Sequence, residues 1–224
     1  MPIRDLLWAC PLCGAVGGLR ADGKLERCRG CATLFRRGTR SIIEAVAPDG
    51  SVDRRPAAAW AARLPAEPPP LEPGGSAGPP STPGAAAASE AETGGAGERV
   101  RRRDRALARF AQGDEPIRRG RAFLGFMERL GPARPGVLTL TDDRLLLRLD
   151  DGEEHRWPLE RLAALQASSA TIQVRPRGEP IVSFAFPDTS ARLWEESLAG
   201  ALRRKWRSLG RGEIAEFQPR IVAR

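Results

Sequence analysis

The sequence predicts a multidomain α+β protein: a small β unit, a linker and a larger antiparallel β-sheet capped by a helix. Three observations support this division. All four cysteines of the 224-residue chain lie near its start, a proline-, glycine- and alanine-rich stretch follows, and short apolar runs then alternate with turn residues. The expected segments are 1–45 for the first β unit, 46–98 for a disordered linker, 99–119 for a basic lead-in helix, 120–210 for the sheet and its helix, and 211–224 for a tail.

The cysteines occur as two pairs, Cys10-Pro-Leu-Cys13 and Cys28-Arg-Gly-Cys31. Each Cys-x-x-Cys pair places two thiolates on one side of a tight turn, and two such turns supply the four soft ligands of tetrahedral zinc. Because the protein provides every ligand, we expect a closed, structural Zn²⁺ site, one per chain. Rubredoxin-like iron and a redox dithiol pair are the alternatives.

The surrounding residues fit this interpretation. Gly14 permits the positive φ that turns backbone N–H groups toward sulfur, and Gly23 lies where a hairpin would turn. Residues 6–40 resemble the zinc-ribbon family, although Gly30 lies inside the second pair and Ala32 follows it where glycine is common. Such a ribbon has a small core, so chelation is expected to unfold residues 1–45 and to leave the C-terminal half folded. Four arginines are placed to offset the thiolate charge: Arg27, Arg29, Arg36 and Arg37.

Residues 46–98 contain almost no bulky apolar side chains and include Pro68-Pro-Pro70 and Gly78-Pro-Pro80. Such a segment buries too little surface to offset its ordering entropy. The linker is therefore expected to be disordered and to be the sole connection between the two units.

The positive charge of the chain is concentrated just after this linker. The net charge of the whole protein is +8, and residues 99–135 alone hold eleven Lys and Arg against four Asp and Glu. We expect a solvated lead-in helix over 99–119; binding of its arginines to phosphate groups of nucleic acid or anionic lipid is the alternative. The candidate anion-binding residues are Arg99, Arg101, Arg102, Arg103, Arg105 and Arg109.

From Gly136 onward the pattern is that of short strands separated by turns. The expected strands are 137–140, 145–149, 155–157, 162–166, 171–175 and 181–186. Asp188, Thr189 and Ser190 then offer helix N-caps, and apolar residues recur at helical spacing from Trp194 to Leu209. A curved antiparallel sheet closed at one end by an amphipathic helix would bury both apolar faces.

These residues resemble the pleckstrin-homology-like (PH-like) superfamily, most closely its GRAM branch. The resemblance covers about 121–207 and rests on Gly136-Val-Leu-Thr-Leu-Thr141 with Arg144-Leu145-Leu146, on Trp157-Pro-Leu159, on Phe184 and Phe186, and on Trp194. It implies a PH-like sheet or barrel that binds membrane phospholipid or protein and does not catalyse a reaction. The basic phosphoinositide signature of lipid-binding members is not evident, since Arg129, Arg134 and Arg144 are scattered.

No catalytic motif is recognisable elsewhere in the sequence. The single histidine, His155, lies in an expected strand and is interpreted as a half-exposed strand residue, and no phosphate-cradling glycine loop is present. The sequence thus indicates a non-catalytic adaptor that binds a protein or an anionic membrane surface. A nucleic-acid-binding protein of transcription or repair, and an accessory subunit of a lipid-modifying enzyme, are the alternatives. Without a signal peptide or an apolar span, we expect a cytoplasmic protein, peripheral at the inner membrane face if it binds lipid.

Overall fold

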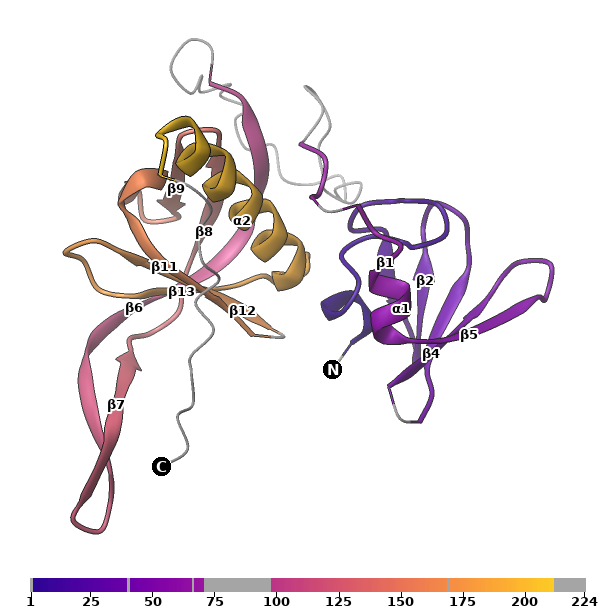
Figure 1. Ribbon diagram of the computed structural model, residues 1–224, viewed down its shortest axis with the longest axis horizontal. Helices are drawn as coiled ribbons and strands as arrows, with labels where there is room; N and C mark the ends of the chain where they lie inside the picture. Colours follow the sequence, from indigo (N-terminus) through magenta and orange to yellow (C-terminus); the bar gives the residue numbers. More distant parts are fainter. Residues whose placement is uncertain (1, 40, 66, 71–97, 169, 212–224) are drawn as a thin grey trace.

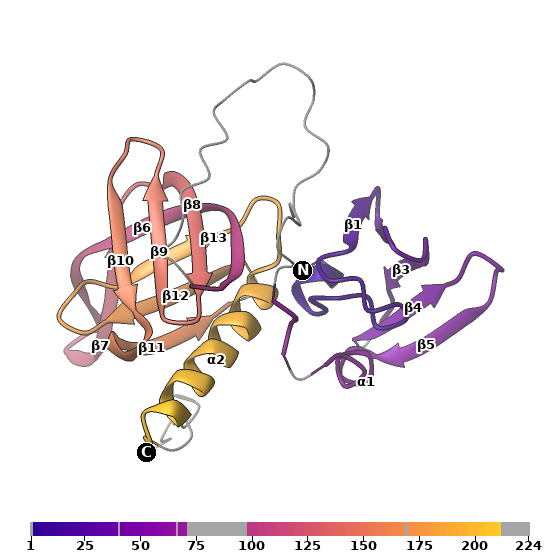
Figure 2. The same ribbon diagram turned by 90° about the horizontal axis from the view of Figure 1, so that it is seen from above.

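The computed structural model describes residues 2–39, 41–65, 67–70, 98–168 and 170–211, which form two antiparallel sheets and a C-terminal helix (Figures 1 and 2). The chain is thus an α+β protein with two folded units. Most of the expected linker, and all of the expected tail except residue 211, lie outside the described residues.

The N-terminal unit is a five-stranded meander preceded by a short 3-10 turn, η1. Consecutive strands pair in the order β1-β2-β3-β4-β5, and Gly23, with a φ of 62°, makes the first hairpin turn between β1 and β2. The carboxylate of the buried Glu26 accepts hydrogen bonds from the backbone N–H groups of Ile3 (2.6 Å) and Arg4 (2.9 Å). The chain start is therefore held against β2. The elements are η1 (Ile3–Asp5), β1 (Leu19–Asp22), β2 (Leu25–Cys28), β3 (Leu34–Arg37), β4 (Ile42–Val46), β5 (Val52–Pro56) and α1 (Ala57–Ala61).

This unit extends well beyond residue 45, so its expected boundary was wrong. Strand β5 and helix α1 lie within the segment assigned to the linker. The indole of Trp60 is fully buried, donates a hydrogen bond to the Ile43 carbonyl at 3.0 Å and contacts Phe35 edge-on with ring centroids 6.1 Å apart. The average composition of 46–98 concealed this one large side chain, whose burial holds the following turn of chain against the sheet.

The C-terminal unit is an eight-stranded sheet curled around one apolar core. Its strand order is β10-β9-β8-β6-β13-β12-β11, with β7 paired to the far half of β6. The long first strand β6 lies between β8 and the last strand β13, and α2 packs on the sheet (Figure 2). The elements are β6 (Val100–Arg119), β7 (Ala122–Leu130), β8 (Arg134–Thr141), β9 (Arg144–Leu149), β10 (Glu154–Pro158), the 3-10 turn η2 (Leu159–Arg161), β11 (Leu162–Ala167), β12 (Thr171–Pro176), β13 (Val182–Ala185) and α2 (Ala191–Ser208).

The six strands and the helix expected after Gly136 are confirmed, with small shifts at their ends. Ser190 caps α2, and its hydroxyl accepts a hydrogen bond from the Arg192 N–H at 3.1 Å. Trp194 on α2 is fully buried, stacks on Phe186 and donates its indole N–H to Asp104 on β6 at 3.0 Å. The helix is thus fixed to the sheet by both apolar and polar contacts.

The expected basic helix over 99–119 was wrong, because this segment is strand β6. Along its first half, buried Arg102, Ala106 and Ala108 alternate with more exposed residues. The extended backbone is favoured over the helix that the arginine run suggested, because the two alanines face the core and β6 pairs with a strand on each side. The sheet therefore begins near residue 100 rather than at 120.

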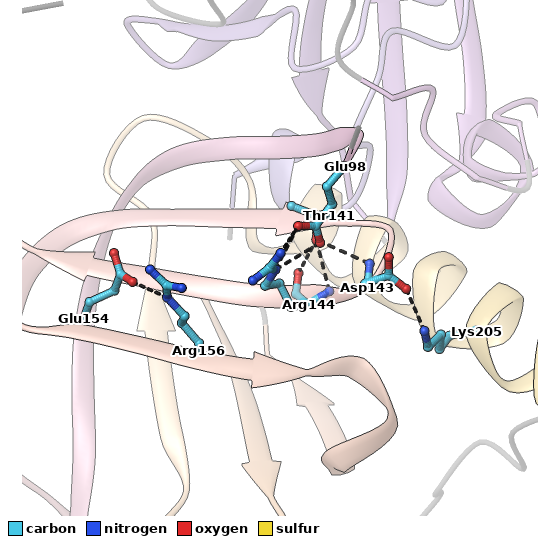
Figure 3. A network of polar contacts seen from close by, with 7 residues as sticks. All are labelled: Glu98, Thr141, Asp143, Arg144, Glu154, Arg156 and Lys205. Atoms are coloured by element: carbon cyan, nitrogen blue, oxygen red, sulfur yellow. Dashed lines mark hydrogen bonds and ion pairs between the residues drawn. The ribbon is translucent and has the colours of Figure 1, made fainter. Parts of the chain in front are cut away.

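A polar network fixes the start of β6 to the turn between β8 and β9 (Figure 3). Glu98, just before β6, accepts hydrogen bonds from the Arg144 guanidinium, whose Nε lies 2.9 Å from Glu98 Oε2, and from the Thr141 hydroxyl. The hydrogen bond from Arg144 lowers the pKa of Glu98 although burial opposes this. Lys205 on α2 completes the network with an ion pair to Asp143 at 2.6 Å.

The two units also contact each other directly, contrary to the expectation that only the linker connects them. Trp8 and Ala9 of the N-terminal unit form a small buried cluster with Leu193 in the first turn of α2. A second contact follows α1, where Glu67 forms an ion pair with Arg204 on α2. These contacts were not visible in the sequence, since each partner is unremarkable in its local pattern.

Candidate functional site

The four cysteines come together at one end of the N-terminal unit, in two turns of nearly identical geometry. In the first turn, the Gly14 N–H donates to the Cys10 carbonyl at 2.8 Å; in the second, the Ala32 N–H donates to the Cys28 carbonyl at 2.9 Å. Both residues that follow the Cys-x-x-Cys pairs have positive φ, 75° for Gly14 and 58° for Ala32. Each turn therefore presents its sulfurs in the same way.

The sulfur positions fit a tetrahedral metal. The four Sγ atoms lie within 4.8 Å of one another, with Cys10 and Cys31 3.7 Å apart and Cys13 and Cys28 3.5 Å apart. A tetrahedron with metal–sulfur bonds of about 2.3 Å has sulfur–sulfur edges of about 3.8 Å. All four thiols are free rather than paired in disulfides. The cluster can therefore hold one metal ion.

Backbone N–H groups point toward the sulfurs, as metal-bound thiolates require. The amides of Leu12 and Cys13 face the Cys10 sulfur, and the Gly30 amide donates to the Cys28 sulfur at 3.3 Å. Burial nonetheless raises the pKa of the Cys10 and Cys28 thiols. A bound divalent cation would offset this desolvation and allow all four groups to ionise.

Gly30 has a packing role that its sequence position did not reveal. A Cβ atom added there would lie 3.0 Å from Cys13 Sγ and 3.0 Å from the Ala15 Cβ atom. A side chain at this position would push the two turns apart, whereas Leu12, at the equivalent position of the first turn, is 41% exposed. The close approach of the two cysteine turns thus favours glycine within the second pair.

Thr33 is a further residue of the site that sequence reasoning missed. Its side chain is buried, and its Oγ1 lies 3.3 Å from Cys31 Sγ. Burial raises the pKa of Cys31, but hydrogen bonds from Thr33 and contacts with the other cysteines outweigh it and lower the pKa to about 7. The sequence offered one sign of this contact: a hydroxyl-bearing residue two positions after Cys31.

Of the arginines expected to offset the thiolate charge, two are paired with carboxylates instead. Arg27 pairs with Asp22 at 2.8 Å, and Arg36 pairs with Glu44. Arg29, between Cys28 and Gly30, is exposed beside the four-cysteine cluster.

The candidate anion-binding arginines do not form one compact patch. Because β6 is extended, Arg99 and Arg109 are separated by about 33 Å at roughly 3.3 Å per residue. Arg101 pairs with Asp142 at 2.5 Å, and Arg105 makes two 2.7 Å hydrogen bonds with Asp150. The remaining candidates divide between the two faces of the strand: Arg99, Arg103 and Arg109 are exposed, whereas Arg102 is buried.

A second basic group lies at the tip of the hairpin formed by β6 and β7, which projects away from the curled sheet (Figure 1). Arg118 and Arg119 end β6, Gly120 turns the chain with a φ of 60°, and Arg121 completes the turn. All three arginines are exposed. These arginines were not among the expected anion-binding residues, because a helix over 99–119 would not have grouped them on one surface.

The only histidine lies at the edge of the apolar core. The His155 ring stacks on Trp157 with centroids 5.4 Å apart and contacts Phe110 at 4.7 Å. Its Nε2 lies 2.9 Å from a carboxylate oxygen of Glu153. These contacts favour a packing role.

The chain matches no protein-family model, and no curated protein is significantly similar to it. Among the described residues, no helix is both long and apolar enough to cross a membrane.

Proposed function

We propose that this protein is a non-catalytic adaptor in which a zinc ribbon is joined to a PH-like module that binds an anionic membrane surface. The four-cysteine cluster supports the zinc ribbon, and the curled sheet with its packed C-terminal helix supports the PH-like module. The observation that carries the binding function is the projecting hairpin with Arg118, Arg119 and Arg121 at its tip.

Zinc is the metal in this proposal. Four thiolates in two Cys-x-x-Cys turns suit zinc and iron alike, and redox-inert zinc agrees with the structural, non-catalytic role proposed here. Metal analysis of protein purified without added metal is expected to give one zinc per chain. A red, iron-containing protein would instead identify a rubredoxin-like centre.

A projecting tip can reach a flat surface that the curled sheet cannot approach. Each Arg near an anionic bilayer contributes about 1 kcal/mol at moderate salt, so three arginines contribute about 3 kcal/mol, or roughly a hundredfold in partitioning. The exposed Arg103 and Arg109 lie farther along the same long strand.

Vesicle co-sedimentation tests this function. The wild-type chain is expected to bind vesicles containing anionic phospholipid and to ignore neutral vesicles. The triple substitution Arg118→Gln, Arg119→Gln and Arg121→Gln should weaken binding by about a hundredfold. The matched control loses the same charge at exposed positions elsewhere, through Arg27→Gln, Arg54→Gln and Arg156→Gln, and should change binding only a few-fold. Equal losses in both variants would contradict a binding role for the tip.

Nucleic acid is the second candidate ligand, because a two-stranded antiparallel ribbon such as β6–β7 fits the major groove of a duplex. The same variants are measured with duplex DNA at several salt concentrations. Binding to DNA with a steep salt dependence, together with indifference to anionic vesicles, would replace the membrane function with this one.

A further inference from the structure

A cavity of about 370 Å³ lies where the N-terminal unit meets the C-terminal unit. The loop after the first cysteine pair and Gly30 form one wall; β6 and the start of α2 form the other. This volume is within the range of small-molecule sites. The cavity is distinct from the basic hairpin, so a ligand bound in it would be independent of the proposed membrane binding.

Three arginines from separate parts of the chain line this cavity: Arg20, Arg29 and Arg102. Arg102 is only 4% exposed, and its Nε is buried without a hydrogen-bond acceptor among the described residues. Its Nη2 has one long contact, 3.5 Å from the Pro69 carbonyl. A buried guanidinium with few hydrogen-bond acceptors is costly, and an anion in the adjoining cavity would offset its charge.

Arg20 and Arg29 add positive charge to the lining from the N-terminal unit, whereas Arg102 belongs to β6. Arg20 is held in place because its Nη1 donates to the carbonyls of Gly17 at 2.7 Å and Leu19 at 3.2 Å. Burial, followed by the nearby charges of Arg29 and Arg4, lowers the pKa of Arg20. Cations crowded in this way bind phosphate well, since guanidinium groups match its oxygens in pairs.

Two carboxyl groups also line the cavity. Asp104 is held by the 3.0 Å hydrogen bond from the Trp194 indole, and Asp188 lies just before the N-cap of α2. These groups would repel a purely anionic ligand but can accept hydrogen bonds from hydroxyl groups. The lining therefore suits a ligand with one anionic end and one hydroxyl-bearing end.

We propose that this cavity binds a small phosphorylated polyol. Its phosphate contacts the guanidinium groups of Arg20, Arg29 and Arg102, and its hydroxyl groups donate hydrogen bonds to Asp104 and Asp188. The site forms only when the two units are in contact, because each unit supplies part of the lining.

Calorimetric titration of the full metal-loaded chain tests the proposal with three probes: ribose 5-phosphate, inorganic phosphate and ribose. Ribose 5-phosphate is expected to bind most tightly, inorganic phosphate more weakly, and ribose not measurably. Arg29→Gln and Arg102→Gln should each weaken ribose 5-phosphate binding by about tenfold or more, and Arg102→Lys should retain part of it. Asp188→Asn should weaken ribose 5-phosphate but not inorganic phosphate. Arg156→Gln, at an exposed position on β10, is the matched control.

Absence of binding by any phosphate probe at about 10 mM would overturn the proposal, as would unchanged affinity in Arg29→Gln. Equal affinity for ribose 5-phosphate and inorganic phosphate would overturn the polyol part alone. Circular dichroism and metal content identify any variant that fails to fold. If the Arg102→Gln variant does not fold, the affinity of the Arg29→Gln variant for ribose 5-phosphate decides between the two outcomes.

Discussion

The two folded units differ in how they are stabilised. Among the described residues, the core of the N-terminal unit comprises nine buried residues, two of them cysteines of the four-cysteine cluster, whereas that of the C-terminal unit comprises nineteen buried residues and no cysteine. A small core rarely stabilises a fold alone, while the larger one buries leucines, tryptophans and a helix together. The first unit is thus expected to depend on its metal and the second to depend on packing.

Metal removal should produce the largest difference in stability between the two units. Binding of structural zinc contributes on the order of 10 kcal/mol to folding, so chelation or Cys28→Ser should unfold the whole N-terminal unit, up to the turn carrying Trp60. Hydrogen exchange measured along the chain should show protection lost in β1–β5 and kept in β8–β12. Loss of protection in both sheets would show that they unfold as one cooperative structure.

Removing the contact between the units should have the next largest effect on stability. Leu193 is 1% exposed and packs against Trp8 and Ala9, so Leu193→Ala should cost about 2–3 kcal/mol. Since one partner belongs to each unit, a double-mutant cycle with Trp8→Ala should give a coupling energy of about 0.5–3 kcal/mol. If the two substitutions lower the free energy of unfolding additively in chemical denaturation, the contact does not couple the stabilities of the two units.

The C-terminal unit carries its own pH dependence. Burial raises the pKa of Asp104 to about 6, although Arg102 and the Trp194 indole oppose the shift. The folded state then binds more protons than the unfolded state between about pH 4 and pH 6, so stability falls as the pH rises through this range, by on the order of 2–3 kcal/mol. Asp104→Asn keeps an oxygen for the indole and should remove this slope. Thermal unfolding of both proteins from pH 4 to pH 7 measures it, and parallel slopes would exclude Asp104 as the cause.

The smallest effect concerns the two cysteine turns. Ala32 has a positive φ that costs an L-residue about 1 kcal/mol, so Ala32→Gly should stabilise the N-terminal unit by up to that amount. Gly14→Ala in the equivalent turn should destabilise it by a similar amount, because open space around Gly14 leaves only the backbone cost. Metal-release midpoints in a chelator titration should move in opposite directions. Movement in the same direction would mean that the two turns are not equivalent.

The sequence by itself determined the four cysteines that could hold a metal ion and most strands of the C-terminal sheet. Ligand spacing within a tight turn is local chemistry, so Cys10, Cys13, Cys28 and Cys31 could be assigned without a fold. Alternation of apolar residues between turns is local as well, and β8–β13 were found on that basis.

Tertiary structure decided the remainder, because long-range burial leaves little trace in a local pattern. The arginine run of β6 is by itself compatible with a helix. In the folded protein this segment is extended because it pairs with β8 and β13. Trp60 became part of the first core only by folding back on Phe35. Arg20, Arg29 and Arg102 share a cavity for the same reason: residues distant in sequence become neighbours only when two separately formed surfaces pack together.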